Sequence, residues 1–77
     1  MSNIDNIRQC LEEMRTHVLF DYKGIACGID PLSRNEIDMW FGEKYYTASS
    51  IDEALTYQLF DGKSIADIAD RVQNLEL

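Results

Sequence analysis

The segment from residue 36 to residue 48 constrains the fold most strongly, because apolar residues occupy every second position of its first half. The apolar residues are Ile37, Met39 and Phe41, and the alternating positions hold Glu36, Asp38 and Trp40. A period of two gives a β-strand one apolar face and one mostly polar face. Residues 44–48, Lys-Tyr-Tyr-Thr-Ala, are mostly residue types that suit a second strand. Between the halves, Gly42 can adopt the positive φ that begins a type II′ turn. We therefore predict a β-hairpin of residues 36–41 and 44–48.

The same alternation places Trp40 on the face that carries the acidic side chains, where one tyrosine of the pair 45–46 also belongs. Tryptophan and tyrosine are common anchors of protein interfaces. Either another segment, such as residues 31–32, covers the indole, or the indole belongs to a protein-binding patch. The residues of that candidate patch are Trp40, Tyr45, Glu36 and Asp38.

The residue pattern before the hairpin predicts one helix and one or two strands. Apolar residues at spacings of three and four predict an amphipathic helix over residues 3–15, capped by Ser2 or Asn3. Residues 18–22 alternate and predict a strand, with a turn at residues 23–24. Residues 25–29 form either a second strand or the bent continuation of the first. Pro31 predicts a loop over residues 30–35.

The segments after the hairpin have helical spacing. Ser49 or Ser50 can cap a helix whose apolar stripe extends to Leu59, and Gly62 lies in the break that follows. Ser64 then opens a last helix that is predicted to continue to Leu75. We predict a single α+β domain over residues 1–77. It has an N-terminal helix, an antiparallel meander of three or four strands, and two short helices on one face of the sheet.

The charge balance excludes several kinds of partner. Seven Lys and Arg residues stand against fourteen Asp and Glu residues, which gives a net charge of −7. Nucleic acids and anionic membranes are bound through basic residues, so neither is an expected partner. No apolar run approaches the roughly 20 residues of a spanning helix. The first residues contain Asp5 and lack the pattern of a signal peptide, so we expect a cytoplasmic protein.

Catalytic, metal and cofactor chemistry find little support in the residue pattern. Cys10 and Cys27 have no metal-ligand spacing around them and are expected to be packed thiols. His17 could act as a base beside either cysteine, but no orienting carboxylate stands at a recognisable spacing. Gly62-Lys63-Ser64 lacks the upstream glycine and the preceding strand of a phosphate-binding loop. We expect no enzyme activity, no metal and no cofactor.

Four short segments carry a resemblance to a group of proteins. They are Phe20-Asp21-Tyr22-Lys23-Gly24, Cys27-Gly28-Ile29-Asp30-Pro31, Met39-Trp40-Phe41-Gly42 and Leu59-Phe60-Asp61-Gly62-Lys63-Ser64. With them the chain resembles small uncharacterised acidic proteins of Gram-positive bacteria over most of residues 18–70. The resemblance implies a bacterial cytoplasmic origin. It implies no activity and no functional residue.

Three functions remain as hypotheses. The first is a small acidic protein-binding module, adaptor or regulator, that binds another protein or a second copy of itself through the sheet face around Trp40. The second is an inhibitor whose carboxylates imitate the phosphates of a nucleic acid, which needs a dense, one-sided array of acidic groups. The third is an enzyme that uses Cys27 or Cys10, which needs a thiol of strongly lowered pKa.

Overall fold

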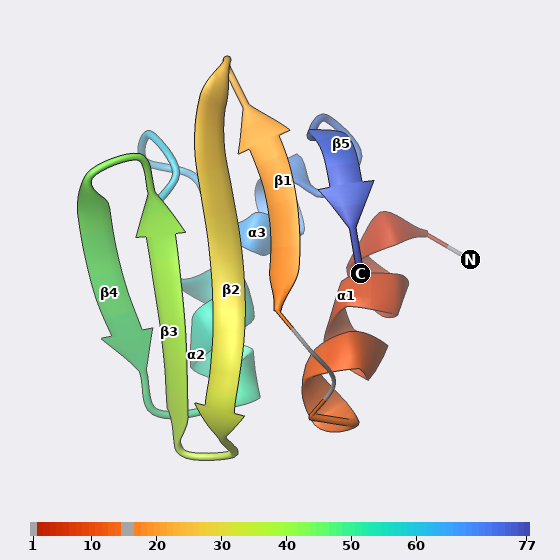
Figure 1. The fold of residues 1–77 in the computed structure, drawn as a ribbon, viewed down its shortest axis with the longest axis vertical. Coiled ribbons are helices and arrows are strands. Elements are labelled where there is room, and N and C mark those ends of the chain that lie inside the picture. The colour runs from red at the N-terminus through yellow and green to blue at the C-terminus, as the bar shows by residue number, and fades with distance from the viewer. Residues whose placement is uncertain (1, 15–16) are drawn as a thin grey trace.

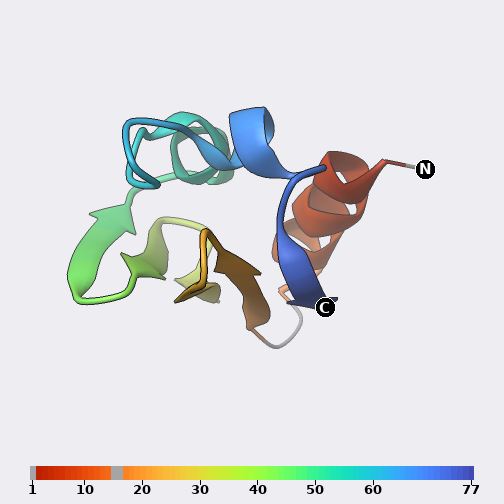
Figure 2. The ribbon, with the colours of Figure 1, turned by 90° about the horizontal axis from the view of Figure 1, so that it is seen from above.

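A five-stranded antiparallel sheet forms one layer of the molecule, and helices cover one of its faces (Figures 1 and 2). The computed structural model describes residues 2–14 and 17–77. Along the chain its elements are α1 (Asn3–Glu12), β1 (Val18–Tyr22), β2 (Ile25–Ser33), β3 (Glu36–Phe41), β4 (Lys44–Ala48), α2 (Ile51–Thr56), α3 (Ile65–Ile68) and β5 (Gln73–Glu76). The predicted α+β class is therefore confirmed, with the N-terminal helix, the antiparallel meander and two short helices on one sheet face. The predicted count of three or four strands holds for the meander β1–β4, but β5 adds a fifth strand to the sheet.

The strands lie in the order β4-β3-β2-β1-β5, so each of the first four strands pairs with its neighbour in the sequence. Short turns between consecutive strands allow this antiparallel arrangement. The register places Cys27 beside Phe20 on one side and beside Phe41 on the other. Because side chains alternate between faces along a strand, these residues all point to the side of the helices.

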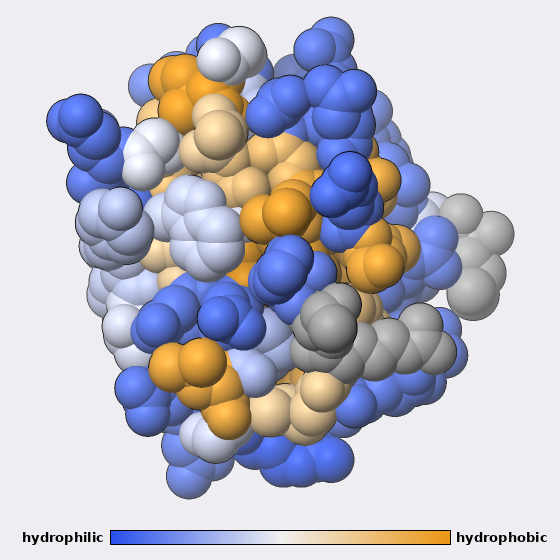
Figure 3. All heavy atoms as spheres, viewed as in Figure 1, coloured by the Kyte–Doolittle hydropathy of each residue, from blue (hydrophilic) through white to orange (hydrophobic). Residues whose placement is uncertain are grey.

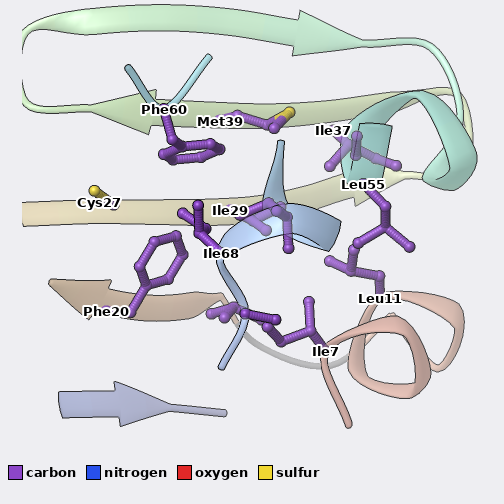
Figure 4. Close-up of a cluster of buried hydrophobic side chains, with 14 of the residues drawn as sticks. Ile7, Leu11, Phe20, Cys27, Ile29, Ile37, Met39, Leu55, Phe60 and Ile68 are labelled. Atoms are coloured by element: carbon purple, nitrogen blue, oxygen red, sulfur yellow. The ribbon is translucent and has the colours of Figure 1, made fainter. Parts of the chain in front are cut away.

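The core lies between the sheet and the helices, and Figure 4 shows its side chains pointing toward one another from both layers. Phe60, in the segment between α2 and α3, is fully buried there. Its ring centroid is 5.7 Å from that of Phe20 and 5.8 Å from that of Phe41. Burying one such side chain contributes roughly 1.5–3 kcal/mol to folding. The helix-facing side of the sheet is thus closed by packing.

The central hairpin forms as the alternation predicts. β3 pairs with β4 in register from Ile37 opposite Ala48 to Phe41 opposite Lys44, and Gly42 has a φ of +60°. Met39 is 1% exposed and faces the core. The apolar row of the hairpin therefore faces the helices, and Trp40 lies on the other side.

Residues 25–29 form a separate strand, which decides between the two alternatives left by the sequence. Lys23 and Gly24 both have positive φ and make the turn. The predicted loop over residues 30–35 is wrong, because β2 continues to Ser33. Pro31 is tolerated there because β1 pairs only with residues 25–29 of β2, so Pro31 has a partner strand on one side only, and a register shift follows it.

The N-terminal helix is capped by Ser2, whose Oγ accepts a hydrogen bond from the amide of Asp5 at 3.4 Å. α1 ends at Glu12 and not at the predicted residue 15, and a turn follows at residues 13–14. Arg15 and Thr16 lie outside the described residues. Cys10 and Leu11 point from this helix into the core.

The C-terminal helices are shorter than predicted. α2 begins after Ser50, one of the two predicted caps, but it ends at Thr56, so Leu59 lies outside any helix or strand. Ser64 and Asp67 form the predicted capping box of α3. That helix ends at Ile68, however, and Leu75 lies in β5.

The fifth strand explains why the last helix ends before Leu75. β5 pairs antiparallel with β1, so it covers an edge that the meander alone would leave open. Asn74 has a φ of +55°, and its side chain donates a hydrogen bond of 2.7 Å to Asp21. Pairing with a distant strand overrides the helical spacing of the last apolar residues. In the described part of the chain, no helix is long and apolar enough to cross a membrane.

The carboxylate of Glu53 joins β4 to α2. It accepts hydrogen bonds from the amide and hydroxyl of Ser49, at 2.6 and 3.0 Å, and from the hydroxyl of Tyr46 at 2.6 Å. The Ser49 amide, and then the Tyr46 and Ser49 hydroxyls, favour the charged form and lower the pKa of Glu53. Tyr46 also stacks on Tyr57, with a centroid distance of 3.5 Å. These contacts hold Tyr46 on the helix side of β4.

The lowered pKa of Glu53 predicts a dependence of stability on pH. A depressed folded-state pKa stabilises the fold above the unfolded value, about 4.3 for Glu, and this stabilisation is lost as pH falls through the folded-state pKa. Urea unfolding at a series of pH values should show a midpoint that falls in acid. In Glu53→Gln the midpoint should be lower at neutral pH and the acid-induced fall should be smaller. An identical acid fall in the variant would contradict the assignment, and Glu12→Gln is the control.

Candidate functional site

The sheet face that points away from the helices, called the open face below, carries the candidate site. Figure 3 views this face and shows apolar side chains near its middle with hydrophilic side chains around them. The residues that form it are Leu19, Asp21, Ala26, Gly28, Asp30, Asp38, Trp40, Tyr45 and Thr47. Trp40 is half-buried. In the described part of the chain, the residues that line the surface on either side of it all lie on strands, and the suggested cover, residues 31–32, is not among them.

The indole of Trp40 takes the place of a side chain at Gly28. These two residues stand opposite each other on β3 and β2. A Cβ built on Gly28 would fall 2.6 Å from Cε2 and Cη2 of the indole, and closer still to Cζ2. The ring therefore leans from β3 across β2, against the backbone. Only glycine leaves room for it there, so Gly28 is required by a close approach and not by a turn.

Tyr45 stands opposite Trp40 on the other side, on β4, and its side chain is 76% exposed. The two rings nevertheless make no ring contact in the described chain. Trp40 leans toward β2, which leaves a gap between the indole and the phenol. The structure thus brings these two predicted residues together on one face. Of the tyrosine pair, Tyr45 is the one on this face.

Two hollows border the indole. The one on the β4 side has a volume of about 290 Å³ and lies between Trp40 and Tyr45, with Asp30, Asp38 and Thr47 also lining it. The one on the β1 side has a volume of about 280 Å³, and its lining includes Leu19, Asp21 and Glu76 as well as Trp40. The indole is therefore a ridge between two acidic hollows.

Two carboxylates oppose each other in the first hollow. Asp30 on β2 and Asp38 on β3 are direct cross-strand partners. Like charges in this position destabilise a sheet. The hydroxyl of Thr47 donates a hydrogen bond of 2.9 Å to Oδ1 of Asp38, and within the described residues neither aspartate has a basic partner. The hollow thus keeps an uncompensated negative charge.

The predicted patch is brought together only in part. Trp40, Tyr45 and Asp38 line one hollow, whereas Glu36 lies at the beginning of β3, opposite Ser33, and outside both hollows. Sequence reasoning missed Gly28 and Asp30. The sequence did contain a signal for them, because the alternation that begins at Ile25 puts Gly28 and Asp30 on one face. Only the register shows that this face is the one that carries Trp40.

The cysteines are packed thiols, as expected. Cys10 is 1% exposed, Cys27 is 2% exposed, and neither forms a disulfide in the described chain. Burial raises the pKa of Cys27 to about 11, so its thiolate is scarce at neutral pH. His17 is exposed and lies beyond the end of α1, so it does not continue the face of that helix that carries Cys10.

Metal ligands do not gather in the described residues, where no group of three His, Cys, Asp or Glu side chains could hold an ion.

The chain matches no protein-family model, no curated protein and no solved structure. The open face therefore has to be interpreted from its own chemistry.

The packing of Trp40 on Gly28 predicts the effect of Gly28→Ala. The added methyl group would occupy the space of the indole and push it into water. Trp40 is the only tryptophan, so its fluorescence reports on this site alone. We expect a red shift of the emission in Gly28→Ala. The control Gly24→Ala strains the turn at a φ of +75° but has nothing within 4 Å of the added Cβ, so we expect no red shift there. An unchanged emission in Gly28→Ala would show that the indole lies elsewhere.

The raised pKa of Cys27 predicts slow alkylation. In the native protein at neutral pH, iodoacetamide should modify Cys27 much more slowly than it modifies the unfolded chain, because the thiol is buried and protonated. Mass spectrometry of a time course in buffer and in urea measures both rates. Rapid modification of Cys27 in buffer would instead support the hypothesis of a thiol enzyme.

Proposed function

We propose that the protein is a small, non-catalytic protein-binding module that uses the open face of its sheet. The observation that carries the proposal is the aromatic pair on that face. Trp40 and Tyr45 stand side by side on neighbouring strands, and Tyr45 is largely exposed. Aromatic anchors next to hollows are typical of the centre of a protein interface.

The charge of this face supports a basic partner. Each of the two hollows beside Trp40 is lined by two carboxylates of its own, and the whole chain has a net charge of −7. Opposite charges at an interface speed association and select the correct partner. A homodimer through this face would bring two copies of Asp30 and Asp38 together. We therefore propose a different protein with a basic segment as the partner.

The distribution of acidic groups supports this proposal over the nucleic-acid mimic. A mimic needs its carboxylates on one side. Here Asp30 and Asp38 lie on the open face, whereas Asp52, Glu53 and Asp67 lie on the helices that cover the opposite face. Apolar and aromatic side chains also interrupt the acidic groups of the open face, as in a mixed protein interface.

We place the module in the cytoplasm. Its two cysteines are buried thiols that form no disulfide in the described chain, which fits a reducing compartment. The acidic composition and the resemblance to small acidic proteins of Gram-positive bacteria agree with a bacterial cytoplasmic origin.

Affinity capture with matched variants tests the proposal. The tagged protein is incubated with a lysate of Gram-positive bacteria, the captured proteins are identified by mass spectrometry, and the purified candidate is titrated by calorimetry. We expect Trp40→Ala and Tyr45→Ala each to weaken binding at least about tenfold, which is about 1.4 kcal/mol. Binding should also weaken as salt is added.

Tyr57→Ala is the control, because it truncates a partly exposed aromatic residue that packs on Tyr46, on the helix side of the sheet. It should leave the affinity unchanged. The proposal is wrong if the partner binds Trp40→Ala as tightly as the native protein. It is also wrong in its choice of partner if the native protein is a dimer in solution and Trp40→Ala is a monomer.

A further inference from the structure

We propose that the hollow between Trp40 and Tyr45 binds the guanidinium group of an arginine side chain that the partner presents. This inference rests on the proposed function, because it names the group that the open face recognises. It gives the open face a specific pocket, where the proposed function needs only an apolar and acidic surface.

The walls of the hollow suit a flat cation. Trp40 and Tyr45 stand opposite each other on neighbouring strands, both line the hollow, and within the described residues their rings make no contact. A guanidinium is planar, is weakly hydrated, and stacks on aromatic faces, with tryptophan as the best ring partner. We therefore expect one inserted guanidinium to pack against both aromatic side chains.

The carboxylates at the same hollow suit the charge and the shape of this group. Asp30 and Asp38 are direct cross-strand partners, and no basic side chain of the described residues neutralises them. Thr47 engages Oδ1 of Asp38, which leaves Oδ2 available to accept a hydrogen bond. An arginine presents five N–H donors in a rigid fork that matches carboxylates. Its binding would relieve the repulsion between the two aspartates.

The size of the hollow favours a side chain over a whole small molecule. Its volume is about 290 Å³. Pockets for drug-sized ligands range from about 300 to 1,000 Å³. The hollow is at the lower limit of that range and is open to solvent on the sheet surface, as a pocket for one protruding residue must be.

Titration with a model compound tests this inference on the full chain. N-acetyl-arginine-N-methylamide is added at low ionic strength, and the indole N–H resonance of Trp40 is followed in ¹H–¹⁵N spectra. The same titration is done with the citrulline compound, which has nearly the same shape but no charge, and with the lysine compound. We expect saturable binding of the arginine compound in the millimolar range, weaker binding of the lysine compound, and none of the citrulline compound.

Matched variants locate the binding. The double variant Asp30→Asn/Asp38→Asn should weaken the binding of the arginine compound by at least about tenfold. It should also stay folded, because it removes a repulsion. Glu12→Gln/Asp70→Asn removes the same charge from exposed residues outside the hollow and should have no effect. The inference is overturned if the arginine compound does not bind, if citrulline or lysine binds as well, or if the double aspartate variant binds normally.

Failure of this inference is distinguishable from failure of the proposed function. If the open face binds its partner without an arginine, the partner's affinity still falls in Trp40→Ala, while the arginine titration shows no saturation. If the open face is not the interface, the partner binds Trp40→Ala normally, whatever the arginine titration shows.

Discussion

The contact between Trp40 and Gly28 determines the character of this molecule. A sheet with helices on only one side leaves its other face in water, and a large aromatic residue on that face would normally stand free. Here the missing side chain of Gly28 lets the indole lie across the neighbouring strand. The ring loses much of its contact with water, and it becomes a fixed ridge with a hollow on each side. The shape of the open face is therefore set by contacts within the chain and not by a bound partner.

The rest of the structure keeps this face open and rigid. Phe60 and the helices of the described residues fill the opposite side (Figure 2). β5 covers one edge of the meander, and Glu53 ties β4 to the helix that follows it. Preorganised aromatic anchors lose less conformational entropy when a partner binds. The proposed site is therefore built on strands at the centre of the sheet and on one strand at its edge.

The hairpin and the fold class could be predicted because their signals are local. Alternation fixed the faces of β3, and Gly42 could adopt the conformation that its turn requires. The fate of residues 69–77 could not be predicted in the same way, because pairing with β1 depends on a distant edge that the apolar spacing does not reveal. The extent of β2 was missed because Pro31 is tolerated only where one neighbouring strand is absent.

The candidate site was half predictable for a similar reason. Trp40, Tyr45 and Asp38 follow from alternation within one hairpin, whereas Gly28 and Asp30 become part of the site only through the register between β2 and β3. In addition, no sequence pattern indicates that a tryptophan of the neighbouring strand packs on a glycine within a strand. The opposed carboxylates therefore appear only when both strands are aligned.

The chemical shift of the Gly28 Hα protons tests the central contact most directly. If the indole lies over the glycine, ring currents should move at least one of these protons strongly upfield, and nuclear Overhauser effects should join them to the Hζ2 and Hη2 protons of Trp40. Gly28 Hα shifts at ordinary strand values, with no Overhauser effect to the indole, would mean that the ring stands free in water and that the two hollows do not exist as described.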